Sequence, residues 1–231
     1  MEPALIVALD VPTLAEMEKA VHRLPDSIEW YKVGLELFCA DGPAVLEPLK
    51  KRNKKIFLDL KLHDIPRTVA NAVKTAASHG VDLITVHAIG GRAMLEAAAG
   101  AARECIDPPK LVAVTTLTSL SQDDFKDLGI ERSVSDQALA LGKLAIDSGI
   151  DGLVTSAHEA GALRREFPQA LLVTPGIRLP GGDVGDQKRI ATPAFAIQQG
   201  ATHLVVGRPI LQADDPAAAA AAICSNIKGT L

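Results

Sequence analysis

The 231-residue chain has few aromatic side chains and no excess of basic charge. Phenylalanine, tyrosine and tryptophan together make up only 3% of the residues. Proteins that bind single-stranded nucleic acids stack bases on aromatic rings, so this scarcity disfavours that class. The net charge of -4 disfavours any nucleic-acid partner, because such binding needs a basic face. Because aromatic residues are so few, the core must be built from alanine, valine, leucine and isoleucine.

Long hydrophobic runs and paired cysteines are also missing. No apolar run approaches the roughly 20 residues of a membrane-spanning helix, so we expect no membrane partner. Met1 is followed by an acidic residue, not by the basic and apolar stretches of a signal peptide. An odd number of widely spaced cysteines fits reduced thiols better than a disulfide framework. We therefore expect a cytoplasmic protein with three small buried thiols, at Cys39, Cys105 and Cys224.

Short β-rich runs alternate with segments of helical spacing along the whole chain. The predicted strands are Ala4–Leu9, Trp30–Val33, Lys55–Leu60, Leu83–Val86, Leu111–Thr116, Gly152–Thr155, Leu171–Val173 and Leu204–Val206. The predicted helices are Thr13–Arg23, Ala44–Lys51, Thr68–Ser78, Ala93–Glu104, Val134–Ser148, Ala157–Glu166, Pro193–Gln199 and Pro216–Ile227. Strict alternation predicts a parallel sheet covered by helices. Eight such units indicate an α/β fold, a single (β/α)₈ TIM-barrel domain over residues 1–231.

Charged residues gather where the first strands end, which is where the active site of such a barrel lies. Asp10 ends the first strand and Lys32 lies near the end of the second. In the third, Asp59 and Lys61 share one face, and the leucines beside them share the other. Two charges inside a barrel are costly unless they are paired. We expect a network with Lys32; the alternative is a salt-bridge cluster that only caps the barrel.

A third carboxylate, Asp64, follows directly after this strand, and Pro66 suits the first turn of the next helix. The resulting pattern Asp-x-Lys-x-x-Asp places alternating charges in one strand-to-helix turn.

The loops after the seventh and eighth strands commonly bind phosphate in this fold. Arg178 leaves the seventh strand, and Gly207-Arg208 ends the eighth. Glycine lets backbone N–H groups approach phosphate oxygens, and the two arginines can supply charge-assisted hydrogen bonds. The loop Leu179–Arg189 between them is long and rich in glycine, which predicts a lid that closes over an anion.

The segment Asp59-Leu-Lys61-Leu-His-Asp64-Ile-Pro66 resembles the active-site signature of the orotidine 5′-phosphate decarboxylase family in its bacterial form. The similarity continues in order and spacing at Asp10, Lys32, Thr115–Ser119, Pro175–Arg178, Asp186–Arg189 and Gly207-Arg208. This resemblance implies cofactor-free and metal-free conversion of orotidine 5′-monophosphate to uridine 5′-monophosphate in de novo pyrimidine biosynthesis.

The resemblance also implies a role for each matching residue. Lys61 would protonate a carbanion-like intermediate at carbon 6 of the pyrimidine, with Asp59 and Asp64 beside it. The enzyme would be a homodimer in which Asp64 and Thr68 come from the partner subunit. The implied substrate contacts are Asp10 and Lys32 at the ribose, Thr118 with Ser119 or Ser121 at the pyrimidine, and Arg178, Gln187, Gly207 and Arg208 at the phosphate.

Two alternatives stay open at this point. Related phosphosugar decarboxylases and aldolases on the same barrel are metal-dependent, and His63 and His87 near Asp59 could serve a metal. No His-x-His pair exists, however. The other alternative is a non-catalytic nucleotide-binding barrel, although binding phosphate alone would not need Asp59, Lys61 and Asp64 together.

Overall fold

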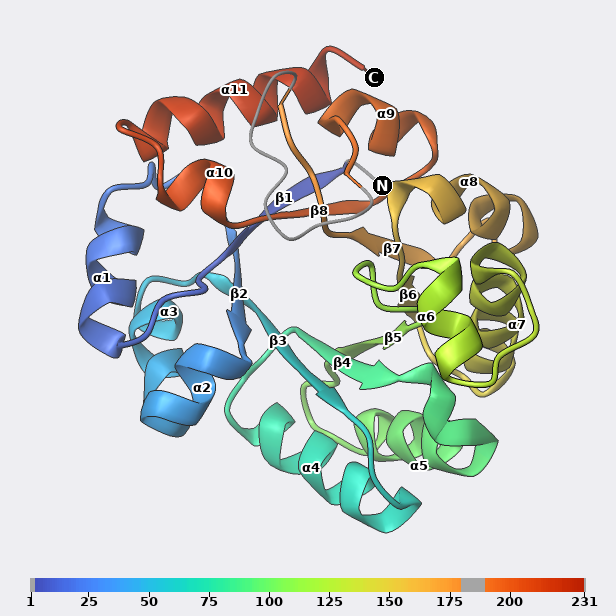
Figure 1. Ribbon diagram of the computed structural model, residues 1–231. Helices are drawn as coiled ribbons and strands as arrows, with labels where there is room; N and C mark the ends of the chain where they lie inside the picture. Colours follow the sequence, from blue (N-terminus) through green and yellow to red (C-terminus); the bar gives the residue numbers. More distant parts are fainter. Residues whose placement is uncertain (1–2, 180–189, 231) are drawn as a thin grey trace.

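The eight parallel strands of the chain close into a barrel in sequence order, and the last strand pairs with the first (Figure 1). The computed structural model describes residues 3–179 and 190–230. The strands are β1 (Ala4–Ala8), β2 (Trp30–Gly34), β3 (Lys55–Leu62), β4 (Leu83–His87), β5 (Lys110–Val114), β6 (Gly152–Val154), β7 (Leu171–Thr174) and β8 (His203–Val206). The predicted barrel is confirmed, and every strand boundary lies within two residues of its predicted position.

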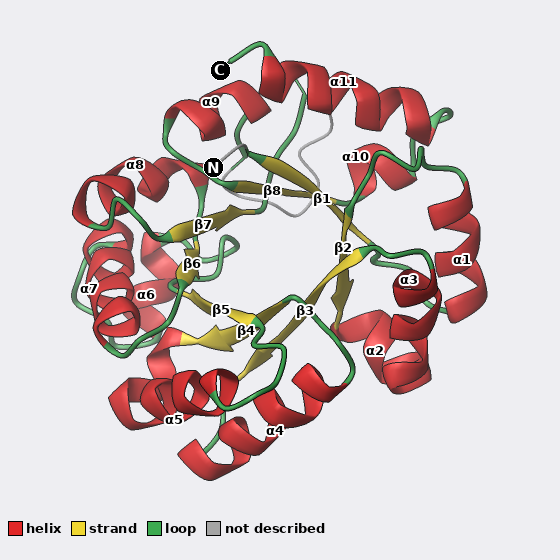
Figure 2. Cartoon of the chain, turned by 180° about the vertical axis from the view of Figure 1, so that it is seen from behind, coloured by secondary structure: helices red, strands yellow, loops and turns green. Residues whose placement is uncertain are grey.

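Helices form a ring outside the strands (Figure 2). They are α1 (Leu14–His22), α2 (Leu35–Asp41), α3 (Glu47–Lys51), α4 (Pro66–Ser78), α5 (Gly91–Arg103), α6 (Gln122–Asp127), α7 (Val134–Asp147), α8 (Ala157–Glu166), α9 (Pro193–Gln198), α10 (Arg208–Leu211) and α11 (Pro216–Lys228), with 3₁₀ turns η1 (Gly42–Leu46) and η2 (Ala88–Gly90). Thr13 caps α1 as predicted, because its hydroxyl accepts a hydrogen bond from the backbone N–H of Glu16 at 3.2 Å.

The predicted helix Ala44–Lys51 is wrong in its boundaries. In the structure η1 and α3 cover this range, and a separate helix, α2, precedes them. Gly42 adopts a φ of 62°, and a proline is the second residue of both η1 and α3. A proline has no N–H to donate and clashes with the preceding turn, so each one starts a new helical segment rather than continuing the last.

Two hydrophobic layers hold the barrel together. A larger core fills the space between the sheet and the helices, and Leu58 belongs to it, with Leu60 and Leu62 packed against it. The leucine face of β3 therefore points outward as predicted. The barrel interior is a small layer of mostly aliphatic side chains: Ile6, Ala8, Phe57, Leu83, Val112, Val173 and Val205. Phe57 is the aromatic member of this layer, and Trp30 packs against the layer.

The three cysteines are free thiols, but the expectation that all are buried is wrong. Cys39 is exposed, and Cys105 and Cys224 are partly exposed. Cys39 lies near the end of the short helix α2, whose buried residue is Leu37, so its side chain takes the solvent-facing side of that helix.

Candidate active site

A cavity of about 450 Å³ opens at the carboxyl end of the strands, where the barrel fold places its active site. Side chains from β1, β2, β3 and from the loops after β5, β7 and β8 surround it. The predicted site residues that line this cavity are Asp10, Lys32, Asp59, Lys61, Thr118, Arg178, Gly207 and Arg208, together with Ser119. The structure thus brings together residues that are up to about 200 positions apart in the sequence.

Four of these residues form a continuous row of alternating charges. The Nζ of Lys32 lies 2.8 Å from Oδ1 of Asp10 and 3.8 Å from Oδ2 of Asp59. The Nζ of Lys61 lies 2.9 Å from Oδ1 and 3.0 Å from Oδ2 of the same Asp59 carboxylate. The side chains of Lys32 and Asp59 are only 9% and 13% exposed. Opposite charges on both sides offset the desolvation cost of these buried groups.

Gly34, at the end of β2, makes room for this row, although it is not among the predicted site residues. A Cβ atom at this position would lie 2.7 Å from Nζ of Lys32 and 3.1 Å from Oδ1 of Asp10. Any side chain would therefore push the lysine ammonium away from its carboxylate. The available signal was a glycine two residues after Lys32, at the end of a strand.

The backbone of β3 departs from regular strand geometry at Lys61. Lys61 has a φ of 50°, the left-handed region, which costs a non-glycine residue about 1–2 kcal/mol. The pairing of β3 with β4 also shifts its register between Leu58 and Leu62. Such strain persists where surrounding contacts fix it, typically at functional sites.

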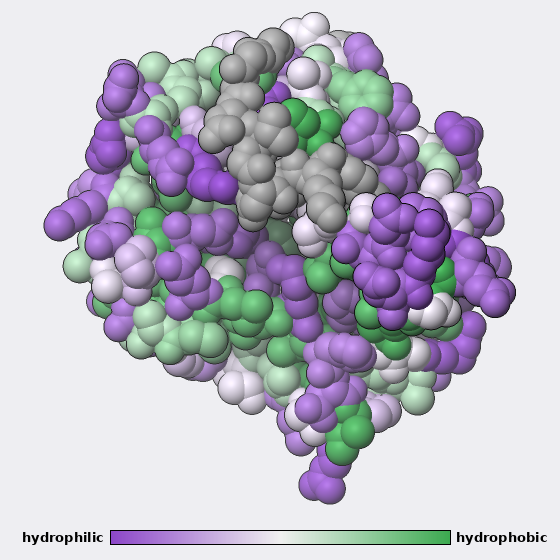
Figure 3. Space-filling view, in the orientation of Figure 1, coloured by the Kyte–Doolittle hydropathy of each residue, from purple (hydrophilic) through white to green (hydrophobic). Residues whose placement is uncertain are grey.

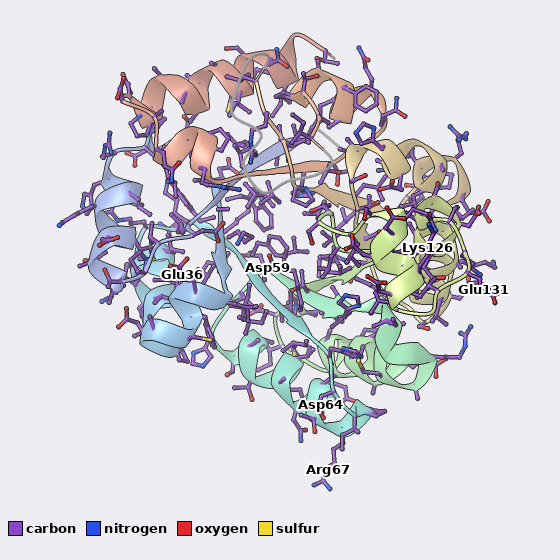
Figure 4. All side chains as sticks on the ribbon, in the orientation of Figure 1. Glu36, Asp59, Asp64, Arg67, Lys126 and Glu131 are labelled. Carbon is purple, nitrogen blue, oxygen red and sulfur yellow. The ribbon has the colours of Figure 1, made fainter. Side chains whose placement is uncertain are left out.

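Asp64 and Thr68 do not line the cavity of their own chain. Both are exposed, in the loop after β3 and the first turn of α4. Figure 4 places Asp59 at the barrel mouth and Asp64, with Arg67, on a projecting tip. Between them Ile65 is 68% exposed. This arrangement leaves the two polar side chains directed at solvent, where a second molecule can reach them.

The residues predicted to bind phosphate that line the cavity follow β7 and β8. Arg178 is 8% exposed and donates from Nη1 to the backbone carbonyl of Ile177 at 2.9 Å. Gly207 precedes α10, and the exposed Arg208 begins that helix. Gln187 and the predicted lid Leu179–Arg189, apart from its first residue, lie outside the described residues.

Ser121 is not a wall residue of the cavity. It is the N-cap of α6, and its hydroxyl and the carboxylate of Asp124 form a reciprocal capping box. Thr118 and Ser119 are the hydroxyl groups of this loop that face the cavity.

A histidine pair lies beside the charged row. The ring centroids of His63 and His87 are 5.6 Å apart. Burial of His87 lowers the pKa of its imidazole, and the nearby His63 and Lys61 lower it further. Within residues 3–179 and 190–230, no group of three or more His, Cys, Asp and Glu side chains is placed to hold a metal ion. In the same part of the chain, no helix is long and apolar enough to cross a membrane.

The defining pattern of the family described as "Orotidine 5'-phosphate decarboxylase / HUMPS family" matches residues 3–223. The chain belongs to this family. Orotidine 5′-phosphate decarboxylase of Moorella thermoacetica is 48% identical over 231 aligned residues, which cover 97% of this chain and 92% of the relative. The enzyme of the same name from Halorhodospira halophila is 49% identical, with 97% and 96% covered.

The same family also supplies a similar solved structure. The crystal structure of orotidine 5′-phosphate decarboxylase from Lactobacillus acidophilus superimposes with a TM-score of 0.87 at 39% identity, covering 98% of this chain and 99% of that one. Members of the orotidine 5′-phosphate decarboxylase family convert orotidine 5′-monophosphate to uridine 5′-monophosphate in pyrimidine biosynthesis. The resemblance stated from the sequence is thereby confirmed.

Proposed function

We propose that this chain decarboxylates orotidine 5′-monophosphate, with Lys61 as the proton donor. The observation that carries the proposal is the row of paired charges Asp10–Lys32–Asp59–Lys61 at the barrel mouth, in a chain of this family. A nucleotide-binding barrel without catalysis would have no need to place four alternating charges in contact, two of them largely buried.

In the proposed reaction, the bond between carbon 6 and the substrate carboxylate breaks and carbon dioxide leaves. The electron pair stays on carbon 6, and the proton from Nζ of Lys61 adds there. An ammonium about 4 Å from a carbanion contributes about 4 kcal/mol at an effective dielectric near 20. Enzymes lower barriers by about 8–23 kcal/mol, so Lys61 supplies only part of the effect.

The rest of the effect comes from positioning. The contacts of Asp59 with both Lys61 and Lys32 fix the ammonium groups before substrate arrives, so the charges need no reorganisation during the reaction. Asp10 and Lys32 bind the ribose hydroxyls, and Thr118 contacts the pyrimidine. Arg178, Gln187, Gly207 and Arg208 hold the phosphate, remote from the breaking bond, and this binding energy supports catalysis at the pyrimidine.

The second part of the proposal is a homodimer that shares its active sites. Asp64 and Thr68 face solvent on the projecting tip, and large exposed apolar side chains follow the ends of β2 to β5 at the same face: Leu35, Ile65, Ile89 and Leu117. Figure 3 shows hydrophobic surface beside the barrel mouth. Exposed apolar patches of this kind mark interaction sites. A two-fold partner would cover them and bring its Asp64 and Thr68 to the cavity of the first chain.

Subunit mixing tests this arrangement. Lys61→Ala and Asp64→Asn are each expected to abolish most activity alone. In a mixed dimer, one cavity would combine the intact Lys61 of one chain with the intact Asp64 of the other. Random mixing of a two-fold dimer then restores about a quarter of the wild-type activity. No recovery after mixing and re-association would contradict the shared site.

The activity itself is tested by following the absorbance of orotidine 5′-monophosphate with the purified chain. We expect loss of the substrate and formation of uridine 5′-monophosphate, unaffected by EDTA. An activity that EDTA abolishes would favour the metal-dependent phosphosugar chemistry. Nucleotide binding without turnover would favour the non-catalytic barrel. We also propose a cytoplasmic location, because three free thiols fit a reducing compartment.

A further inference from the structure

Thr85 is a fully buried threonine in the middle of β4, and it is not among the site residues named above. Its exposed fraction is 0%. Leu83 of the same strand belongs to the interior layer of the barrel, and strand side chains alternate in direction. The hydroxyl of Thr85 therefore points into the barrel, directly beneath the charged row.

The register shift of β3 leaves Thr85 opposite three residues. Leu58 pairs with Ile84, and Leu62 pairs with Val86. Between these pairs β3 has residues 59, 60 and 61, whereas β4 has residue 85 alone. Ladder hydrogen bonds are lost where a strand carries extra residues. The polar groups of this stretch need other partners, because buried backbone groups are almost always paired.

The Thr85 hydroxyl is the hydrogen-bond partner of two polar groups of this stretch. The backbone N–H of Lys61 donates to Oγ1 of Thr85 at 2.8 Å. The same hydroxyl donates to Oδ1 of Asp59 at 3.1 Å. Since Lys61 also binds the Asp59 carboxylate through Nζ, the contacts close a ring from the Lys61 backbone through Thr85 and Asp59 to the Lys61 ammonium.

The two hydrogen bonds of Thr85 fix a backbone conformation and a carboxylate orientation that regular strand pairing would leave undetermined. The bond to the N–H holds Lys61 in its left-handed backbone conformation. The bond to Oδ1 fixes the rotation of the Asp59 carboxylate, so that its second oxygen faces Lys32. A hydroxyl has one proton to donate and can accept at the same time, which is the combination used here. Serine can do the same, whereas valine has the shape of threonine without either function.

We propose that Thr85 is a positioning residue for the decarboxylation, acting by holding Lys61 and Asp59 in their reactive arrangement. This inference rests on the roles proposed above for those two residues. Thr85 does not line the cavity, so it acts through Lys61 and Asp59 and not on the substrate.

The test compares three variants by steady-state kinetics with active-site concentrations determined by titration. We expect Thr85→Val to lower kcat by about 10- to 100-fold, because small misplacements of reacting groups cost this much. KM should stay within about threefold, since the phosphate and ribose contacts lie on other strands. Thr85→Ser should keep kcat within about threefold of the wild type.

Thr174→Val is the matched control. Thr174 is also a fully buried strand threonine, and its hydroxyl has no hydrogen-bond partner in the described part of the chain. We expect its kcat to equal that of the wild type. A second readout is exchange of the carbon-6 proton of uridine 5′-monophosphate in D₂O, followed by proton NMR. This exchange reports proton transfer involving Lys61 without decarboxylation, and it should slow in Thr85→Val together with kcat.

Three results would overturn the inference: Thr85→Val with kcat within threefold of wild type, Thr85→Ser impaired as strongly as Thr85→Val, or a raised KM with unchanged kcat. If Thr85→Val does not fold, Thr85→Ala takes its place with the same expected loss, and a kcat within threefold overturns the proposal equally. An inactive wild-type enzyme would instead contradict the proposed function. The two failures are therefore distinguishable.

Discussion

The two ends of the barrel are built from different kinds of side chain. At the carboxyl end, Asp10, Lys32, Asp59 and Lys61 form a row of paired charges around an open cavity. At the amino end, the ring of Trp30 meets the ring of His203 edge-on, with centroids 5.4 Å apart. Lys55 lies 5.5 Å from the centre of the Trp30 ring. Figure 2 shows the barrel from this second side.

This difference between the two ends suggests that one end of the sheet serves the reaction and the other serves stability. The charges at the carboxyl end belong to the proposed catalytic site, where each one contacts a charge of opposite sign. At the amino end, Trp30 packs against the interior layer of the barrel. Changes at the first end should therefore reduce turnover, and changes at the second should reduce the free energy of unfolding.

The largest expected effect is at the carboxyl end. Lys61→Ala removes the proposed proton donor, and we expect kcat to fall by about 1,000-fold or more, as general acids and electrostatic groups combine their contributions. Binding of uridine 5′-monophosphate, measured by calorimetry, should be partly retained because the phosphate contacts remain. Residual turnover above about 1% of the wild type would remove Lys61 from the acid role.

The amino end gives the next prediction, which concerns pH. Burial lowers the pKa of His203 to about 4, and nearby Lys55 contributes. Between pH 6.5 and pH 4 the unfolded chain binds a proton at this position and the folded chain does not. The free energy of unfolding should therefore decrease as the pH falls through this range, by up to about 3 kcal/mol, with no further loss from this group below pH 4.

Urea unfolding at pH 7 and pH 4.5 measures this effect. His203→Leu serves as the comparison, since it removes the titrating group and should lose less stability on acidification than the wild type. Its kcat at pH 7 should match the wild type, because the carboxyl end is untouched. An identical pH dependence of unfolding in both proteins would rule out His203 as the source.

Much of the barrel and of its carboxyl end could be predicted from the sequence. The alternation of strands and helices predicted the barrel, and the charged residues at strand ends predicted which side chains would meet. The face of β3 that carries Asp59 and Lys61 followed from simple two-residue periodicity. These features depend on local pattern, which the sequence carries directly.

Features that depend on tertiary context could not be read in this way. Gly34 matters because of where Lys32 and Asp10 lie in space, and Thr85 because β3 carries extra residues opposite it. The short helices α2, α6 and α10 were missed, since helices of four to seven residues are too short for a periodic signal. The contact between His203 and Trp30 joins residues far apart in the sequence, and no local pattern indicates it.

A smaller effect is expected at the phosphate wall. Arg208→Ala should lower kcat/KM by about 10- to 100-fold, as lost hydrogen bonds to a charged group cost about 1.5–3 kcal/mol. Arg165→Ala, at an exposed position of α8, is the matched control and should leave the kinetics unchanged. Equal kinetics for the two variants would contradict the phosphate role of Arg208.

The smallest effect is expected at Gly34. The backbone there is extended, with a φ of -102°, so alanine fits without strain. Its Cβ would displace the flexible end of Lys32. We expect Gly34→Ala to lower kcat/KM by about three- to tenfold and to change the free energy of unfolding by less than about 1 kcal/mol. A loss of stability without a kinetic change would show that Gly34 serves the fold and not the charged row.

Closure of the barrel between β1 and β8 has a consequence for biosynthesis. Ala4 pairs with His203, so β1 finds one of its two neighbours only after the roughly 200 residues between the two strands have been made. At about 5–20 residues per second, β1 waits roughly 10–40 seconds with one edge unpaired. During that interval the nascent chain presents an open strand edge, the feature on which proteins pair wrongly with one another.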